Sequence, residues 1–381
     1  MESALVLALL RVLFAELSCI FVTLGQNGVS YFIKHLICML YLTYRNRTTP
    51  LRFPEPELVT ERHTPESLGL IYPEREWLQE RPKSAEHLKS KEDFHIFHGT
   101  HIESESTLIF RLSRLQEGLC QAFMVLRLDG TDTLSLQNEI KLDLSDSHAY
   151  QGCGLTLECL APMRRWRVNF NGLMNDQNGR ERHVKFSGIW VAGSHTFEYP
   201  QQISIKSMAD SLSHLHPLSM AAQIRSIYKD EFFYSQMGRF DLEVSVDKSE
   251  PQEVHLWGSR LHFAGILEPR TEVHKFGHFR DGHRLHLIIR KVEDQTLYFG
   301  SAYEPRTKTL AITSADMIPE AFVATTEKEV FAMSVGEQTL ARQALKTRHP
   351  KVNDKFVAYQ ESATMRGRKG VILTMEVERY A

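Results

Sequence analysis

The sequence lacks most of the motifs that would identify a ready-made catalytic or metal-binding protein. Its 381 residues include only five cysteines and no C-x-x-C pair, which argues against a disulfide framework and a zinc knuckle. It contains no glycine-rich phosphate loop and no G-x-S-x-G nucleophile elbow. The formal net charge of −2 creates no field that attracts nucleic acid. We therefore expect no nucleic-acid partner, no cofactor and no metal, and we lean away from an enzyme.

What the sequence does contain is typical of a folded protein. Hydrophobic residues make up 42% of the chain and charged residues 24%, so most of it can bury a core. The length predicts two to three domains. The unpaired cysteine pattern weakly favours a reducing compartment.

The N-terminus is the most apolar part of the chain. Residues 4–24 are apolar except for Arg11 and Glu16, and as a helix they would extend about 31 Å, enough to cross a bilayer. A second apolar run covers 29–44. Three interpretations remain open, namely a spanning anchor, a helical pair lying in the membrane interface, and a buried helix. We assign 1–47 as a hydrophobic helical membrane anchor and, because basic residues follow it, place the globular part in the cytosol.

The remainder of the chain has a mainly β pattern. Residues 48–93 are rich in Pro, Glu and Arg, and we interpret them as a linker with one short helix near Glu74–Gln79. Short alternating segments begin near Phe94, are interrupted by a helical interval at Pro217–Gln236, and then resume. The sequence therefore predicts two antiparallel sandwich or barrel halves: a first β-domain over 94–212, a helical interval over 213–240 and a second β-domain over 241–381.

The segment "RRWRVNFNG" contains three arginines close to one tryptophan, which could form an anion-binding patch. On a strand, however, side chains alternate between two faces. Arg165, Arg167 and Asn169 then share one face, whereas Trp166, Val168 and Phe170 share the other. We therefore predict a core strand with a polar outer face.

Two histidine-rich segments are candidates for chemistry. In "HIFHGTH", His95, His98 and His101 would diverge on a strand, and no carboxylate or cysteine completes a metal site. The second segment holds His278, Arg280, Asp281 and His283, which could perform acid–base catalysis. Because Asp281-Gly282 is also a common hairpin turn, a purely structural role remains the alternative.

Large aromatic residues lie on the predicted strands. Barrels of this size either fill their interior with such side chains or enclose an apolar ligand. The residues that we propose as possible cavity lining are Trp166, Phe170, Trp190 and Trp257.

Three segments carry a resemblance to a known family: Phe97–Arg114, Leu155–Met174, whose most specific part is Pro162–Gly172, and Phe232–Phe240. Together they resemble the uncharacterised β-rich region of metazoan phosphoenolpyruvate synthase-like (rifampicin phosphotransferase-like) proteins. That region is in turn distantly similar to the lipocalin-like domains of carotenoid hydratase-type proteins. The resemblance implies a lipocalin-like pair of domains. The ATP-grasp and phosphohistidine domains of those proteins have no counterpart here, so we do not expect their phosphotransferase activity.

The sequence therefore predicts a membrane-anchored, non-catalytic β-protein that binds an apolar, lipid-like molecule or a protein partner. Two alternatives stay open. One is a hydratase or isomerase acting on an apolar substrate through the region of Asp281 and His283. The other is an accessory half of a phosphoenolpyruvate synthase-like phosphotransferase.

Overall fold

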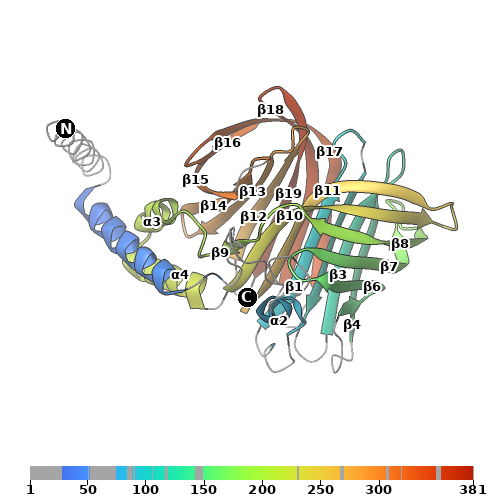
Figure 1. Cartoon of the computed structure of the whole chain (residues 1–381), viewed down its shortest axis with the longest axis horizontal. Coiled ribbons are helices and arrows are strands. Elements are labelled where there is room, and N and C mark those ends of the chain that lie inside the picture. The colour runs from blue at the N-terminus through green and yellow to red at the C-terminus, as the bar shows by residue number, and fades with distance from the viewer. Residues whose placement is uncertain are drawn as a thin grey trace, which may run out of the picture.

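The computed structural model describes residues 28–49, 51, 74–83, 88, 91–104, 106–115, 119–141, 149–229, 231–266, 270–305, 309–318, 320–348 and 353–380. The described chain is mainly β, as the sequence predicts. It forms two closed antiparallel barrels of eight strands each, with short helices inserted between strands of the first (Figure 1).

The first barrel has the strand order β4-β3-β2-β1-β11-β10-β8-β7, and it closes where Ser135 of β4 pairs with Asn175 of β7. Its strands are β1 (Lys91–Thr100), β2 (Thr107–Arg114), β3 (Leu119–Arg127), β4 (Leu134–Lys141), β7 (Arg165–Asn175), β8 (Glu181–Ala192), β10 (Glu231–Val246) and β11 (Gln252–Ile266). Three short strands extend this sheet: β5 (Tyr150–Gly152) and β6 (Leu155–Ala161) beyond β7, and β9 (Phe197–Tyr199) beside β10.

The second barrel is a simple meander in which each strand pairs with the next and β12 pairs with β19. Its strands are β12 (Arg270–Phe279), β13 (Arg284–Val292), β14 (Gln295–Tyr303), β15 (Thr309–Ile318), β16 (Ala321–Thr326), β17 (Val330–Arg348), β18 (Asn353–Met365) and β19 (Arg368–Tyr380). Leu287 and Phe322 belong to the apolar core that fills it.

The boundary between the barrels differs from the predicted domain boundary at residue 241. Both β10 and β11 belong to the first barrel, so the change of barrel falls between Ile266 and Arg270. The helical interval is an insertion within the first barrel and not a domain boundary, because β10 pairs with β8 on one side and with β11 on the other. Local periodicity predicts the helical segment, but it does not predict which strand the following strand pairs with.

Strand β7 confirms the alternation predicted for "RRWRVNFNG". Trp166, Val168 and Phe170 are buried in the first barrel, whereas Arg165 and Arg167 are exposed. The two arginines therefore lie on the outer face, where Arg167 pairs with Glu158.

A row of glycines allows close approach of the strands in the first barrel. Gly258 of β11 pairs with Gly99 of β1 and with Gly238 of β10. A Cβ atom at Gly258 would lie 1.7 Å from the carbonyl oxygen of His98. Glycine in a strand interior commonly marks such an approach of one backbone to another.

We expect Gly258→Ala to lower the free energy of unfolding by about 1–3 kcal/mol, since the two strands must move apart. Gly193→Ala is the matched control, because there the nearest atoms lie 3.8 Å from the new Cβ. Urea unfolding of both variants measures the difference. Equal stability of the two would show that the strands relax without cost.

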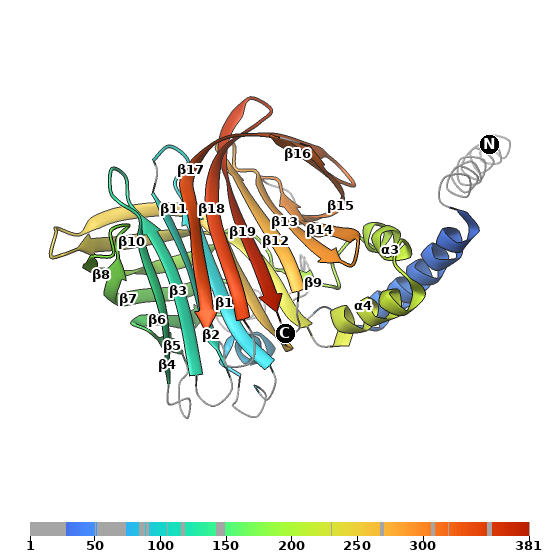
Figure 2. The same cartoon turned by 180° about the vertical axis from the view of Figure 1, so that it is seen from behind.

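Three helices form a layer at one side of the barrels: helix 28–48, α3 (Ile205–Ser213) and α4 (Pro217–Lys229) (Figures 1 and 2). Helix 28–48 docks through a buried side that includes Tyr31, Cys38 and Leu42. Tyr31 donates to Asp210, and Lys34 donates to the carbonyl of Leu215 at 2.8 Å.

No helix in the described part of the chain is long and apolar enough to cross a membrane. The predicted span at residues 4–24 lies outside the described residues. The second apolar run, which the prediction included in the anchor of 1–47, forms the docked helix 28–48.

The short helix predicted near Glu74–Gln79 is confirmed as α2 (Glu74–Glu80). It lies against the first barrel near β1 (Figure 1) and ends at Glu80, whose side chain is fully buried. This part of the predicted linker 48–93 therefore belongs to the first barrel.

Candidate functional site

The predicted acid–base residues do not form one site. Asp281 and His283 meet at the turn between β12 and β13, where Nδ1 of His283 lies 2.9 Å from Oδ1 of Asp281. Arg280 points elsewhere and pairs with Glu103 at 2.8 Å, with both side chains exposed. His278 is fully buried against the first barrel, 5.4 Å from His98 between ring centroids.

The turn residue His283 also has two carboxylates near it, those of Glu304 and Glu329, at a spacing that a metal ion could bridge. All three residues are partly exposed, and Glu329 already pairs with Arg366 at 3.2 Å. A cation at these three residues would therefore compete with Arg366 for Glu329.

The four predicted cavity-lining residues have two different locations. Trp166, Phe170 and Trp190 are packed in the interior of the first barrel, whereas Trp257 is 39% exposed, with the guanidinium of Arg284 4.7 Å from its ring centroid. A small pocket of about 30 Å³ does exist, but it lies between the barrels and none of the four lines it. A space of this size holds water but not a lipid.

A larger cleft of about 400 Å³ opens where the β1–β2 loop meets β17, β18 and β19. Its walls mix hydroxyl groups, for example those of Ser104 and Ser362, with apolar side chains such as Val335 and Val371. The cleft is open to solvent.

The densest group of chemically active side chains lies inside the first barrel. Arg260 of β11 donates to both carboxylate oxygens of Glu80, with two N–O distances of 2.8 Å. Both side chains are completely buried. Burial alone would raise the pKa of Glu80, but the adjacent guanidinium outweighs it and holds the pKa below its usual value.

A hydrogen-bond chain runs from this ion pair to Asp93. The hydroxyl of Tyr234 donates to Glu80 at 2.6 Å, so the Tyr234 oxygen accepts a hydrogen bond from Nδ1 of His262 at 3.1 Å. Nε2 of His262 lies 2.8 Å from Asp93, and one proton is shared between these two groups. Burial raises the pKa of Asp93, which favours such sharing.

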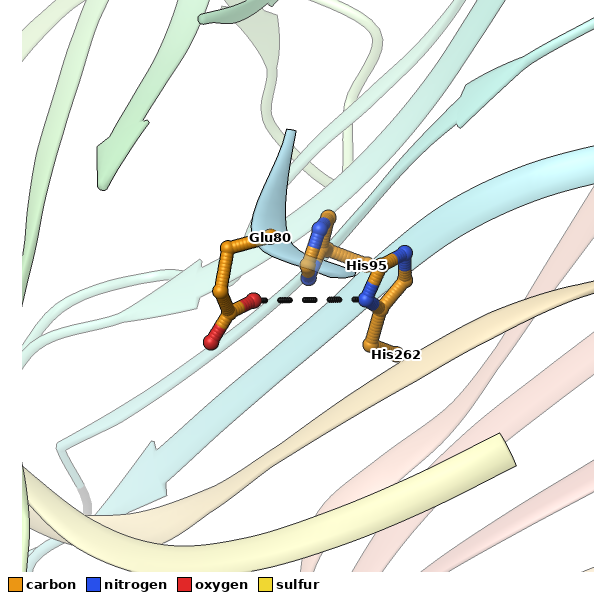
Figure 3. Close-up of side chains that lie close together, drawn as sticks. All are labelled: Glu80, His95 and His262. Atoms are coloured by element: carbon orange, nitrogen blue, oxygen red, sulfur yellow. Dashed lines mark ion pairs between the residues drawn. The ribbon is translucent and has the colours of Figure 1, made fainter. Parts of the chain in front are cut away.

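His95 stacks on this chain. Its ring centroid lies 3.9 Å from that of His262, and neither of its ring nitrogens has a hydrogen-bond partner among the described residues. Burial places its pKa well below the usual value, so His95 is neutral. Figure 3 shows Glu80, His95 and His262 facing one another.

The spacing of these three side chains suits a metal ion, but their chemistry does not. Glu80 is engaged by Arg260 and Tyr234, and Nδ1 of His262 carries a proton. A metal ion needs free lone pairs and would lie beside the Arg260 cation. The cluster is therefore a network of buried ion pairs.

Sequence reasoning missed this network. The sequence places His95 in "HIFHGTH" and Glu80 in the predicted linker, and no motif singles out Arg260 or His262. The available signal was the position of Glu80 at the end of the short helix α2, directly before the first barrel strand.

Comparison with known proteins places the chain in one family. No curated protein matches it. A family model described as "Family of unknown function (DUF8627)" matches residues 27–289, which run from helix 28–48 through the first barrel to β13. Since this match covers more than half of the chain, the protein belongs to the family of unknown function DUF8627.

Proposed function

We propose that this protein is a non-catalytic double β-barrel that attaches to a membrane surface through helix 28–48. The observation that carries the proposal is the apolar outer face of this helix. Seven of its large hydrophobic side chains are between 40% and 65% exposed: Val29, Ile33, Leu36, Ile37, Leu40, Tyr41 and Tyr44. Leu218 of the adjoining α4 is 75% exposed.

The charge of the helix favours lipid over another occupant. Residues 28–48 contain Lys34, Arg45 and Arg47 but no aspartate or glutamate. An amphipathic helix with an apolar face and basic flanks binds anionic membrane surfaces. In the sequence it follows the apolar residues 4–24, which extends the apolar character toward the N-terminus. Basic residues at this position support the cytosolic leaflet as the place of attachment.

Kinship with the β-rich region of phosphoenolpyruvate synthase-like proteins is part of this proposal. Such kinship implies two adjoining lipocalin-like domains, and two adjoining eight-stranded barrels accord with it. The proposal assigns no phosphotransferase activity. It also assigns the aromatic residues inside the first barrel to packing, because they are closely surrounded by other core side chains.

Liposome co-sedimentation tests the attachment. We expect the full chain to bind vesicles that contain anionic lipid. The double variant Ile37→Glu/Leu40→Glu should bind at least about 10-fold more weakly, because two apolar contacts are lost and negative charge is added. Ile318→Glu is the matched control, since Ile318 is 54% exposed on β15 of the second barrel.

Unchanged binding by the double variant would contradict the role of helix 28–48. A wild-type chain that stays in the supernatant as a dimer would contradict it too, and would point to a second copy as the occupant of the face.

A further inference from the structure

The carboxylate of Glu80 is held entirely by groups of the first barrel. Oε1 accepts hydrogen bonds from Arg260 at 2.8 Å and from the backbone N–H of Met163 at 3.2 Å. Oε2 accepts from Arg260 at 2.8 Å and from Tyr234 at 2.6 Å. A carboxylate has about four acceptor positions, so this one is saturated.

The groups that hold Glu80 are themselves fixed by the barrel. Gln236 of β10 accepts from Arg260 at 3.0 Å and donates to the carbonyl of Met163 at 2.7 Å. Met163 has a φ of 57°, an unfavourable backbone region for a residue with a side chain, and this conformation directs its N–H toward Glu80.

Aromatic rings surround the guanidinium of Arg260. The ring centroids of Trp166, Trp190 and Tyr234 lie 5.1, 5.3 and 5.1 Å from it. They hold its planar fork in one orientation without using its hydrogen bonds. The barrel therefore has a rigid, preformed receptor for one planar anion with two oxygens.

We propose that Arg260, Tyr234 and the Met163 amide form a carboxylate-binding site, and that Glu80 occupies it as a ligand carried by the chain itself. A small free carboxylate then takes the place of Glu80 when the Glu80 side chain is removed, because the donors that hold it remain in place. The geometry selects a carboxylate because two parallel N–H groups match its two oxygens. A carboxamide would turn its own N–H₂ toward one of these donors.

Chemical rescue tests this site. Glu80→Ala removes one methylene and one carboxylate, which are the heavy atoms of acetate. We expect about 100 mM sodium acetate to raise the Tm of the variant by about 3 °C relative to the same concentration of sodium chloride. Acetamide, which has the shape but not the charge, should give no rise.

Two proteins control for general salt effects. The wild-type chain has its site filled, and Leu78→Ala changes an exposed residue of the same helix, so neither should respond to acetate more than to chloride. An equal response of all three proteins, an equal response to acetamide, or no response of the variant would overturn the proposal.

If Glu80→Ala folds poorly, refolding tests whether acetate binds at the site. The variant is then refolded from urea in acetate and in chloride, and native tryptophan fluorescence is recorded. Recovery in acetate alone supports the site, and failure in both salts refutes it.

Discussion

Arg260→Met is expected to lower the free energy of unfolding of the first barrel by about 3–5 kcal/mol. The guanidinium and the carboxylate of Glu80 are both completely buried, so the substitution leaves the carboxylate in the barrel interior without its guanidinium partner. All four tryptophans of the chain precede Arg270. Tryptophan fluorescence during urea unfolding therefore follows the first barrel and not the second.

An exposed ion pair on the same barrel supplies the control. Arg167 and Glu158 approach to 2.5 Å, but their side chains are 47% and 44% exposed. Arg167→Met should cost less than about 1 kcal/mol, because water solvates the remaining carboxylate. The double variant Glu80→Leu/Arg260→Met should recover part of the loss, since no charge stays buried. Similar losses for Arg260→Met and Arg167→Met would show that the buried network is unimportant.

Local pattern was enough to predict the elements of this fold. Alternation of apolar residues predicted mainly β structure and oriented β7 with Trp166 inward, and the structure shows both. Each of these features depends on residues within about ten positions of one another. Such information does not say which strands pair across the chain. For that reason the prediction divided β10 between the helical interval and the second β-domain, and assigned β11 to the second β-domain.

The buried network depends on pairing between distant strands. The register places His262 opposite His95 on β1 and opposite Tyr234 on β10, so three residues that are far apart in sequence form one row. The row was not predictable from any single segment.

Strand β11 was also misleading by itself. Leu261 and Phe263 alternate with Arg260 and His262, a pattern that usually indicates one buried and one solvated face. Here both faces are buried, because the second barrel covers the outer one. The polar residues therefore point into the first barrel and not into water.

Acidification is expected to destabilise the contact between the barrels. His98 of β1, His278 of β12 and His286 of β13 are all fully buried there. Burial lowers the pKa of His98 to about 3 and the pKa values of His278 and His286 well below the usual value. The folded protein therefore keeps the three imidazoles neutral at pH values at which the unfolded chain protonates them.

The sign of the effect follows from proton uptake. Each histidine with a lowered pKa contributes stability above about pH 6.5, and this contribution is lost as the pH falls toward the folded-state pKa. One such group accounts for about 1.4 kcal/mol per pH unit once it is protonated in the unfolded chain. Three of them predict a loss of about 4 kcal/mol per pH unit below about pH 5.5.

Most charged neighbours of these histidines lower their pKa values further. Arg284 lowers the pKa of His278, and His274 lowers that of His286, whereas Glu272 alone opposes the change at His286. Urea midpoints measured by circular dichroism at about pH 7.5, 6.5 and 5.5 should therefore fall in that order.

Substitution at His98 isolates one part of the pH dependence. His98→Phe keeps an aromatic ring against Phe276, whose centroid lies 4.2 Å away, but takes up no proton. We expect the slope of the free energy of unfolding against pH, below about pH 5.5, to decrease by about 1.4 kcal/mol per pH unit. His195→Phe should leave the slope unchanged, because His195 is exposed in the folded protein as well. If His98→Phe retains the full wild-type slope, the acid sensitivity arises elsewhere, and the barrels do not depend on neutral imidazoles for their contact.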